Sequence, residues 1–176
     1  MGVLDAIGGY ITGGMVPGNS RALSGTEIAA TREVFESTIP YSRVVITNDL
    51  GLDDAPYTTP AGPFFRLHLG PQRFANAGSD LPTLIHELTH VWQGHNHIFT
   101  TGYVFDSLWH QGKARLTGGS AYDCVPGAPW GTYNVEQQAR LVEEWYVNGK
   151  QESDPRFPYI RDRIRRPTVS WLREPF

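Results

Sequence analysis

The segment His86-Glu87-Leu88-Thr89-His90 constrains this chain more than any other part of its sequence. Residues four apart lie on the same face of an α-helix, so the two histidines can converge on one metal ion only if the segment is helical. Asp80 is suited to cap such a helix and Gly94 to end it. Apolar side chains that could bury the helix recur along it: Leu81, Leu84, Ile85, Leu88 and Val91. We therefore predict a buried, metal-binding helix that begins at Leu81.

A catalytic zinc normally has three protein ligands and keeps a fourth position for water, so one more ligand is needed. In the pattern HExxHxxGxxH the third ligand is the last histidine, and Asn96 occupies that position here. His95 and His97 each lie one residue away from it. A carboxylate from a separate helix is the alternative. Three glutamates are candidates for that role: Glu136, Glu143 and Glu144.

A second ligand-bearing helix is predicted where these glutamates lie. Asn134 is suited to cap it and Gly149 to end it. Its apolar stripe consists of Val135, Ala139, Val142 and Tyr146. We expect Glu136 to be the third ligand, because it lies in the first turn and the small Ala139 permits close packing against the metal helix. Glu143, about two turns further on, is the alternative ligand or a hydrogen-bond partner for an imidazole.

Glu87 lies between the two histidines, where a general base for hydrolysis is needed. With zinc as the preferred ion for this ligand set, the expected activity is hydrolysis of a peptide or amide bond by a metallopeptidase whose substrate is a protein or peptide. The oxyanion of such a reaction needs a further donor. The sequence offers four unranked candidates for that donor or for substrate contacts: Tyr133, Tyr146, His110 and His97.

The rest of the chain predicts an α+β fold. Ser24 and Glu27 form a capping box before a helix over about residues 25–37. Short strands are expected at Arg43–Thr47 and at Phe64–Leu69, and the second could be the cleft edge that an extended substrate joins. We expect a single compact zincin-like domain with a small, mainly antiparallel sheet. It would span residues 23–176, after a glycine-rich N-terminal arm over residues 1–22.

Composition excludes several other classes of protein. The length of 176 residues and the 40% hydrophobic content suit one folded domain, and the net charge of -3 does not favour nucleic acid as a partner. Cys124 is the only cysteine, so neither an internal disulfide nor a Cys-rich zinc site can form. No apolar run is long enough to span a membrane, and residues 1–20 do not match a signal peptide. We expect a cytoplasmic location in the producing cell, or export without a classical signal peptide.

Three strings of the sequence together resemble the small zincin-like proteins associated with Vgr and Rhs secretion elements. They are Pro40-Tyr41-Ser42-Arg43-Val44, the segment from Leu84 to Gln93, and Tyr133-Asn134-Val135-Glu136-Gln137-Gln138-Ala139. The resemblance covers about residues 22–166 and implies a gluzincin-like site with Glu136 as third ligand. It also implies a secretion-system effector, or toxin, with a secretion apparatus or carrier as partner. Arg140 departs from the pattern, which has Asp four residues after the ligand glutamate.

The sequence leaves two other interpretations open. In one, the chain is a noncatalytic binding or assembly module of a secretion particle, and zinc only stabilises its fold. The intact Glu87 disfavours this interpretation, because a structural zinc site has no use for a general base. In the other, residues 95–131 cover the cleft and hold the enzyme inactive.

Overall fold

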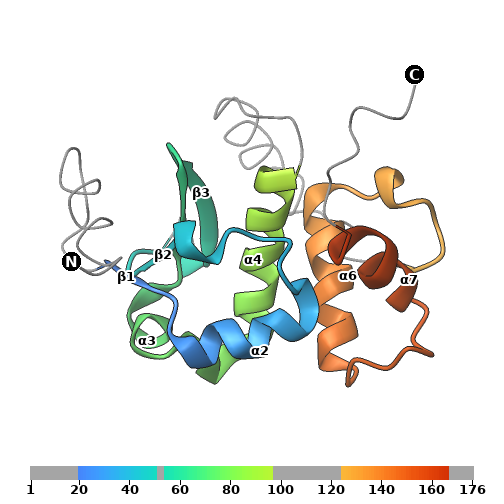
Figure 1. Ribbon diagram of the computed structural model, residues 1–176, viewed down its shortest axis with the longest axis horizontal. Coiled ribbons are helices and arrows are strands. Elements are labelled where there is room, and N and C mark those ends of the chain that lie inside the picture. The colour runs from blue at the N-terminus through green and yellow to red at the C-terminus, as the bar shows by residue number, and fades with distance from the viewer. Residues whose placement is uncertain (1–19, 51–53, 97–123, 167–176) are drawn as a thin grey trace.

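The computed structural model describes residues 20–50, 54–96 and 124–166 (Figure 1). Helices and a small sheet together give the α+β fold that the sequence predicts. Four strands form the described sheet: β1 (Ser20–Ala22), β2 (Val44–Thr47), β3 (Tyr57–Ala61) and β4 (Phe64–His68). Their order is β1-β2-β4-β3, and only the β2–β4 pair is parallel. The sheet is therefore mainly antiparallel.

The outer strand β3 corrects the expectation that Phe64–Leu69 forms the edge of a cleft. That segment became β4, which pairs with β2 on one side and with β3 on the other. β3 comes from a proline-containing stretch in which no strand was predicted. Proline has no N–H group to donate to a neighbouring strand, so it is tolerated in an edge strand, where some N–H groups have no strand to bind. Pro60 is in the edge strand β3 and lies opposite Phe65 of β4.

The three long helices begin where their caps predict. In α2 (Gly25–Phe35) the capping box between Ser24 and Glu27 is complete. In α4 (Leu81–Asn96) Asp80 accepts a hydrogen bond from the Thr83 amide. In α6 (Val135–Val147) Asn134 is the cap, paired with Gln137.

Helix ends were predicted less well than helix starts. Gly94 does not end α4, which continues to Asn96. The side-chain nitrogen of Asn96 donates to the carbonyl oxygens of Trp92 and Thr38. This contact with a distant segment stabilises the last turn, which the sequence pattern alone does not reveal. α6 does end just before Gly149, whose φ of 84° is in the left-handed region that favours glycine.

Helix α4 lies at the centre of the molecule, between the sheet and α6, and α2 crosses its lower end (Figure 1). Leu88 of α4 and Leu141 and Val142 of α6 are completely buried in the core. The shorter helices of the described fold are α3 (Gly70–Ala75), α7 (Phe157–Tyr159) and the π-helix Ile160–Ile164. Three 3₁₀ turns complete it, at Tyr41–Arg43, Ala77–Asp80 and Trp130–Thr132. The indole of Trp92 donates to the carbonyl of Ile164 at 3.0 Å, which ties the C-terminal segment to α4.

Residues 20–22 were assigned to the N-terminal arm, but they form β1. Arg21 fixes this strand, since its guanidinium binds the buried carboxylate of Glu27 through two hydrogen bonds of 2.8 Å. The rest of the arm, residues 1–19, lies outside the described residues. Within the described part of the chain, no helix is long and apolar enough to cross a bilayer.

Candidate metal centre

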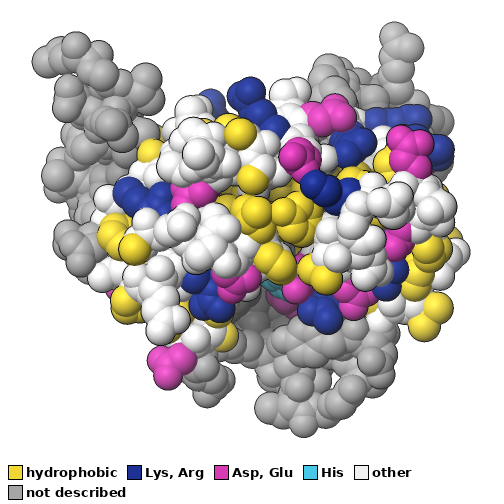
Figure 2. Space-filling view, turned by 90° about the horizontal axis from the view of Figure 1, so that it is seen from below, with side chains coloured by type: hydrophobic (Ala, Val, Ile, Leu, Met, Phe, Trp, Pro, Cys, Tyr) yellow, Lys and Arg dark blue, Asp and Glu magenta, His cyan; other side chains and the backbone are white. Residues whose placement is uncertain are grey.

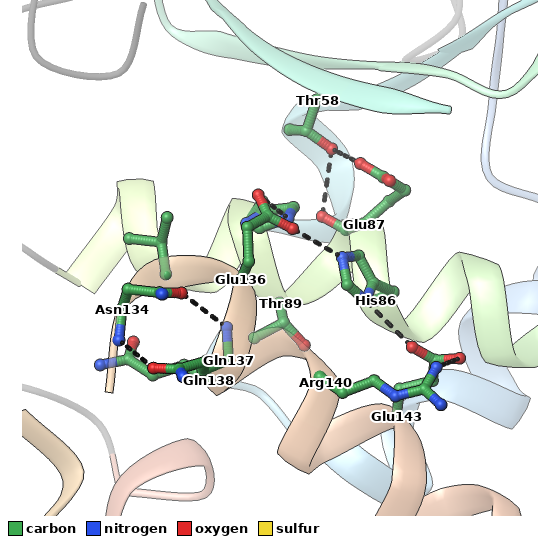
Figure 3. Close-up of polar contacts among 12 residues, drawn as sticks. Thr58, His86, Glu87, Thr89, Asn134, Glu136, Gln137, Gln138, Arg140 and Glu143 are labelled. Carbon is green, nitrogen blue, oxygen red and sulfur yellow. Dashed lines mark hydrogen bonds and ion pairs between the residues drawn. The ribbon is translucent and has the colours of Figure 1, made fainter. Parts of the chain in front are cut away.

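Two helices bring three ligand side chains of the predicted set together. His86 and His90 lie one turn apart on α4. Glu136 faces His86 from the first turn of α6 (Figure 3) and also lies close to His90. One ligand atom from each of the three lies within 4.8 Å of the other two. Nε2 of His86 is 3.3 Å from Glu136 Oε2, and Nε2 of His90 is 3.5 Å from Glu136 Oε1. Both imidazoles therefore present the same ring nitrogen to one carboxylate.

The donor set fits zinc. Two imidazole nitrogens and one carboxylate oxygen are the ligands of a His2Glu site, and three protein ligands leave a fourth position for water or substrate. The side chains of His86 and Glu136 are 16% and 14% exposed, so the group is not sealed from solvent. Seen from below, histidine surface lies beside acidic side chains near the middle of that face (Figure 2).

The three groups perturb one another electrostatically. Burial lowers the pKa of His86, but hydrogen bonds to Glu136 and Glu143 outweigh this effect and raise the pKa to about 10. Burial likewise lowers the pKa of His90, and the charge of Glu136 reverses this into a net increase. Burial raises the pKa of Glu136, yet the two histidines hold it far below its usual range. Glu136 is therefore ionised at neutral pH, which is the state in which a carboxylate binds a metal ion.

Each imidazole is oriented through its other ring nitrogen, Nδ1. For His86 the partner is Glu143, whose Oε2 lies 3.0 Å away. Arg140 donates to the second oxygen of Glu143 at 3.2 Å and to Glu144 at 2.9 Å. Arg140, which departs from the gluzincin pattern, thus positions the carboxylate that orients His86. Of the two roles that the sequence left open for Glu143, the structure shows the hydrogen-bond partner of His86. Glu143 is not part of the group of three ligand side chains.

The Nδ1 partner of His90 is Gln93, whose side-chain oxygen lies 2.8 Å away. Sequence reasoning did not assign a role to this glutamine. A signal was available, because residues three apart on a helix are neighbours and metal-binding histidines usually bond an acceptor through the nitrogen that faces away from the metal.

Glu87 lies on the side of α4 that faces the sheet. It is 4% exposed, and the hydroxyl of Thr58 lies 2.7 Å from its Oε2 and 3.2 Å from its carbonyl oxygen (Figure 3). Thr58 belongs to β3, so the edge strand holds the predicted base. No sequence signal pointed to Thr58, since 29 residues separate it from Glu87.

Other candidates from the sequence do not join this group. The hydroxyl of Tyr133 donates to the carbonyl of Val125, accepts from the Ala128 amide and lies 3.3 Å from the hydroxyl of Tyr159, so it braces a loop. The ring of Tyr146 is covered by the ammonium group of Lys150. Three further residues complete the account: His95 is on the last turn of α4 but outside the ligand group, and His97 and His110 lie outside the described residues.

Comparison with known proteins places this chain beside one secretion protein. No family model matches the sequence. In an alignment 175 residues long that covers 89% of this chain, it is 29% identical to the type VI secretion system spike protein VgrG2b of Pseudomonas aeruginosa, of which the match covers only 17%. The solved effector domain of that VgrG2b has the same fold, with a TM-score of 0.57 and 27% identity over 89% of this chain and 92% of the domain. The chain is therefore homologous to the VgrG2b effector domain.

Proposed function

We propose that this protein is a zinc-dependent hydrolase, a metallopeptidase that cleaves a peptide or amide bond. One observation carries the proposal: His86, His90 and Glu136 converge from two helices while Glu87 follows directly on the first of them. This set supplies three ligands, an open coordination position and a base, which are the parts that a zincin needs. The zincin-like character of the fold is part of the same proposal.

The chemistry divides between the metal and Glu87. Zinc, when bound, would polarise the substrate carbonyl and lower the pKa of a water molecule. Glu87 would take a proton from the attacking water and deliver it to the leaving amine. Thr58 donates a hydrogen bond to Oε2 of Glu87. The other carboxylate oxygen of Glu87, Oε1, can accept the proton. The low exposure of Glu87 keeps bulk water from competing for that proton.

The edge strand β3 supports a peptide as the substrate. In the described sheet β3 pairs with β4 alone, so its outer edge can accept another extended segment. Thr58 lies on this strand and also contacts Glu87, which would bring a strand-like substrate close to the base. A peptide added here would therefore run past the metal group.

The homology to VgrG2b supports a role as an effector of a secretion system. VgrG2b is a spike protein, and its matching part is an effector domain. We extend the effector role to this chain and propose that a secretion apparatus or carrier is its partner and exports it from the producing cell. Because the match covers 17% of VgrG2b, the other activities of that protein are not transferred.

The test compares cleavage with zinc content. Wild type, Glu87→Gln and the control Glu152→Gln, an exposed glutamate, are each incubated with proteome-derived peptides and with cell-wall muropeptides. Mass spectrometry then identifies new termini. We expect Glu87→Gln to retain one zinc per chain and lose cleavage, with Glu152→Gln behaving like wild type. Zinc binding by wild type without any Glu87-dependent cleavage would instead favour the noncatalytic, zinc-stabilised module.

A further inference from the structure

Two buried glutamines connect the metal group to the start of α6. Gln93 on α4 is 2% exposed and Gln138 on α6 is 8% exposed. We propose that these side chains form a hydrogen-bond relay that keeps a hydrogen atom on Nδ1 of His90 and so reserves Nε2 for the metal. Gln93 and Gln138 are thus positioning residues. The inference rests on the proposed zinc site for its functional meaning, whereas the relay itself rests on hydrogen bonds within the protein.

The orientation of the Gln138 amide is fixed at its nitrogen end. This nitrogen donates to the backbone carbonyls of Trp130 and Tyr133, at 3.2 Å each. A carbonyl oxygen can only accept a hydrogen bond, so the side-chain oxygen of Gln138 could not replace the nitrogen there without facing two acceptors. The oxygen of Gln138 must therefore point the other way, toward Gln93.

The orientation of Gln93 follows from this arrangement. Its nitrogen donates one hydrogen to the oxygen of Gln138 at 3.0 Å and the other to the carbonyl of Val135 at 2.9 Å. Both partners are acceptors. If the Gln93 amide were flipped, its oxygen would face the oxygens of Gln138 and Val135, and no hydrogen bond could form between them. The side-chain oxygen of Gln93 is thereby directed at His90.

The last step of the relay sets the hydrogen on the imidazole. Nδ1 of His90 lies 2.8 Å from the oxygen of Gln93, and an amide oxygen cannot donate. Nδ1 must carry the hydrogen, whether the ring is neutral or protonated. Only Nε2 can give up its hydrogen and coordinate a metal, and this is the atom that faces Glu136 at 3.5 Å.

The relay also joins the two ligand-bearing helices. Val135, which accepts from Gln93, directly precedes Glu136, and Trp130 and Tyr133 belong to the segment that leads into α6. One glutamine therefore fixes the hydrogen of one ligand and the backbone next to another. Gln93 ends the string Leu84–Gln93 and Gln138 lies in the string from Tyr133 to Ala139, so the relay connects two of the strings singled out in the sequence.

The experiment measures zinc affinity in matched leucine variants. Dissociation constants are obtained by competition with a chromogenic chelator for wild type, Gln93→Leu, Gln138→Leu and Gln137→Leu. The last variant is the control, because Gln137 forms a capping bond at the same helix start but contacts neither imidazole. Gln93→Leu should weaken zinc binding by about 10- to 100-fold. Gln138→Leu should weaken it less, since Val135 still holds Gln93, and Gln137→Leu should leave it unchanged.

A second measurement needs no variant, and its first part needs no zinc. Protein labelled with ¹⁵N-histidine is studied by long-range ¹H–¹⁵N NMR, first metal-free and then with zinc added. The relay predicts that Nδ1 of His90 carries a hydrogen in both samples. A zinc affinity that is equal in folded Gln93→Leu and wild type, or a His90 Nδ1 without hydrogen, would overturn the relay. If the wild type bound no zinc, the proposed function would fail, whereas a His90 Nδ1 without hydrogen in the metal-free spectrum would separately overturn the relay.

Discussion

Glu27 offers the sharpest test of how the fold is held together. Its buried carboxylate accepts four hydrogen bonds, two on each oxygen. The donors are the guanidinium of Arg21 at 2.8 Å twice, the amide of Ser24 at 2.7 Å and the amide of Ala77 at 2.8 Å. In Glu27→Gln one oxygen becomes an NH₂ group, which cannot accept. That group would face two donors, so the substitution removes hydrogen bonds and adds repulsion where β1, α2 and the turn Ala77–Asp80 before α4 meet.

The magnitude follows from the pKa of the carboxylate. Burial raises the pKa of Glu27, but the hydrogen bonds and charge of Arg21 together with the Ser24 amide lower it from 4.5 to about 2. A lowering of this size corresponds to roughly 3 kcal/mol of stability. Because Arg21 is 25% exposed, solvent screening reduces this electrostatic contribution to about 2 kcal/mol. With the lost hydrogen bond from the Ala77 amide, which is not among the causes of the lowered pKa, Glu27→Gln should lower the free energy of unfolding by about 3 kcal/mol at pH 7.

The assay is equilibrium urea unfolding of the metal-free protein at several pH values, with Glu33→Gln as the control. Glu33 is on the same helix, but its side chain is 55% exposed. Because the folded-state pKa of Glu27 is lowered, its contribution is complete above about pH 4.5 and is lost as the pH falls through 2. The difference between wild type and Glu27→Gln should shrink over that range. A difference below about 1 kcal/mol at neutral pH, or one that does not depend on pH, would refute the reasoning.

Three further predictions concern the site and its support. Glu143→Gln weakens the acceptor on His86 Nδ1 and should raise the zinc dissociation constant about 10-fold or more in chelator competition; an unchanged constant would contradict this role. Leu88→Ala, at a completely buried position, should cost about 2 to 5 kcal/mol in urea unfolding. Thr58→Val removes the hydroxyl that holds Glu87 and should lower cleavage at unchanged zinc content, whereas zinc loss would argue against that assignment.

The helices were predictable because their signals are local. The caps Ser24, Asp80 and Asn134 each lie within three residues of the amide that they bind, and spacing alone placed His86 and His90 on one face. The proximity of Glu136 followed from its position early in a helix with a small residue on its packing face. Such features need no knowledge of the tertiary fold.

The sheet edge and the hydrogen-bond partners of the imidazoles depend on contacts between distant residues. β3 was missed because prolines around it suggested turns, and only its position at the sheet edge makes a strand acceptable there. Gln93 and Gln138 are 45 residues apart in sequence, and the packing of α4 on α6 brings them together. Arg140 departs from the gluzincin pattern, and only the structure shows that it binds Glu143.

Anomalous X-ray scattering at the zinc edge, from crystals grown with zinc, tests the central claim most directly. The account predicts one zinc ion per chain, about 2.0 to 2.2 Å from Nε2 of His86, Nε2 of His90 and a carboxylate oxygen of Glu136, with a fourth position free of protein. A zinc ion closed in by a fourth protein ligand, or bound without Glu136, would contradict the account.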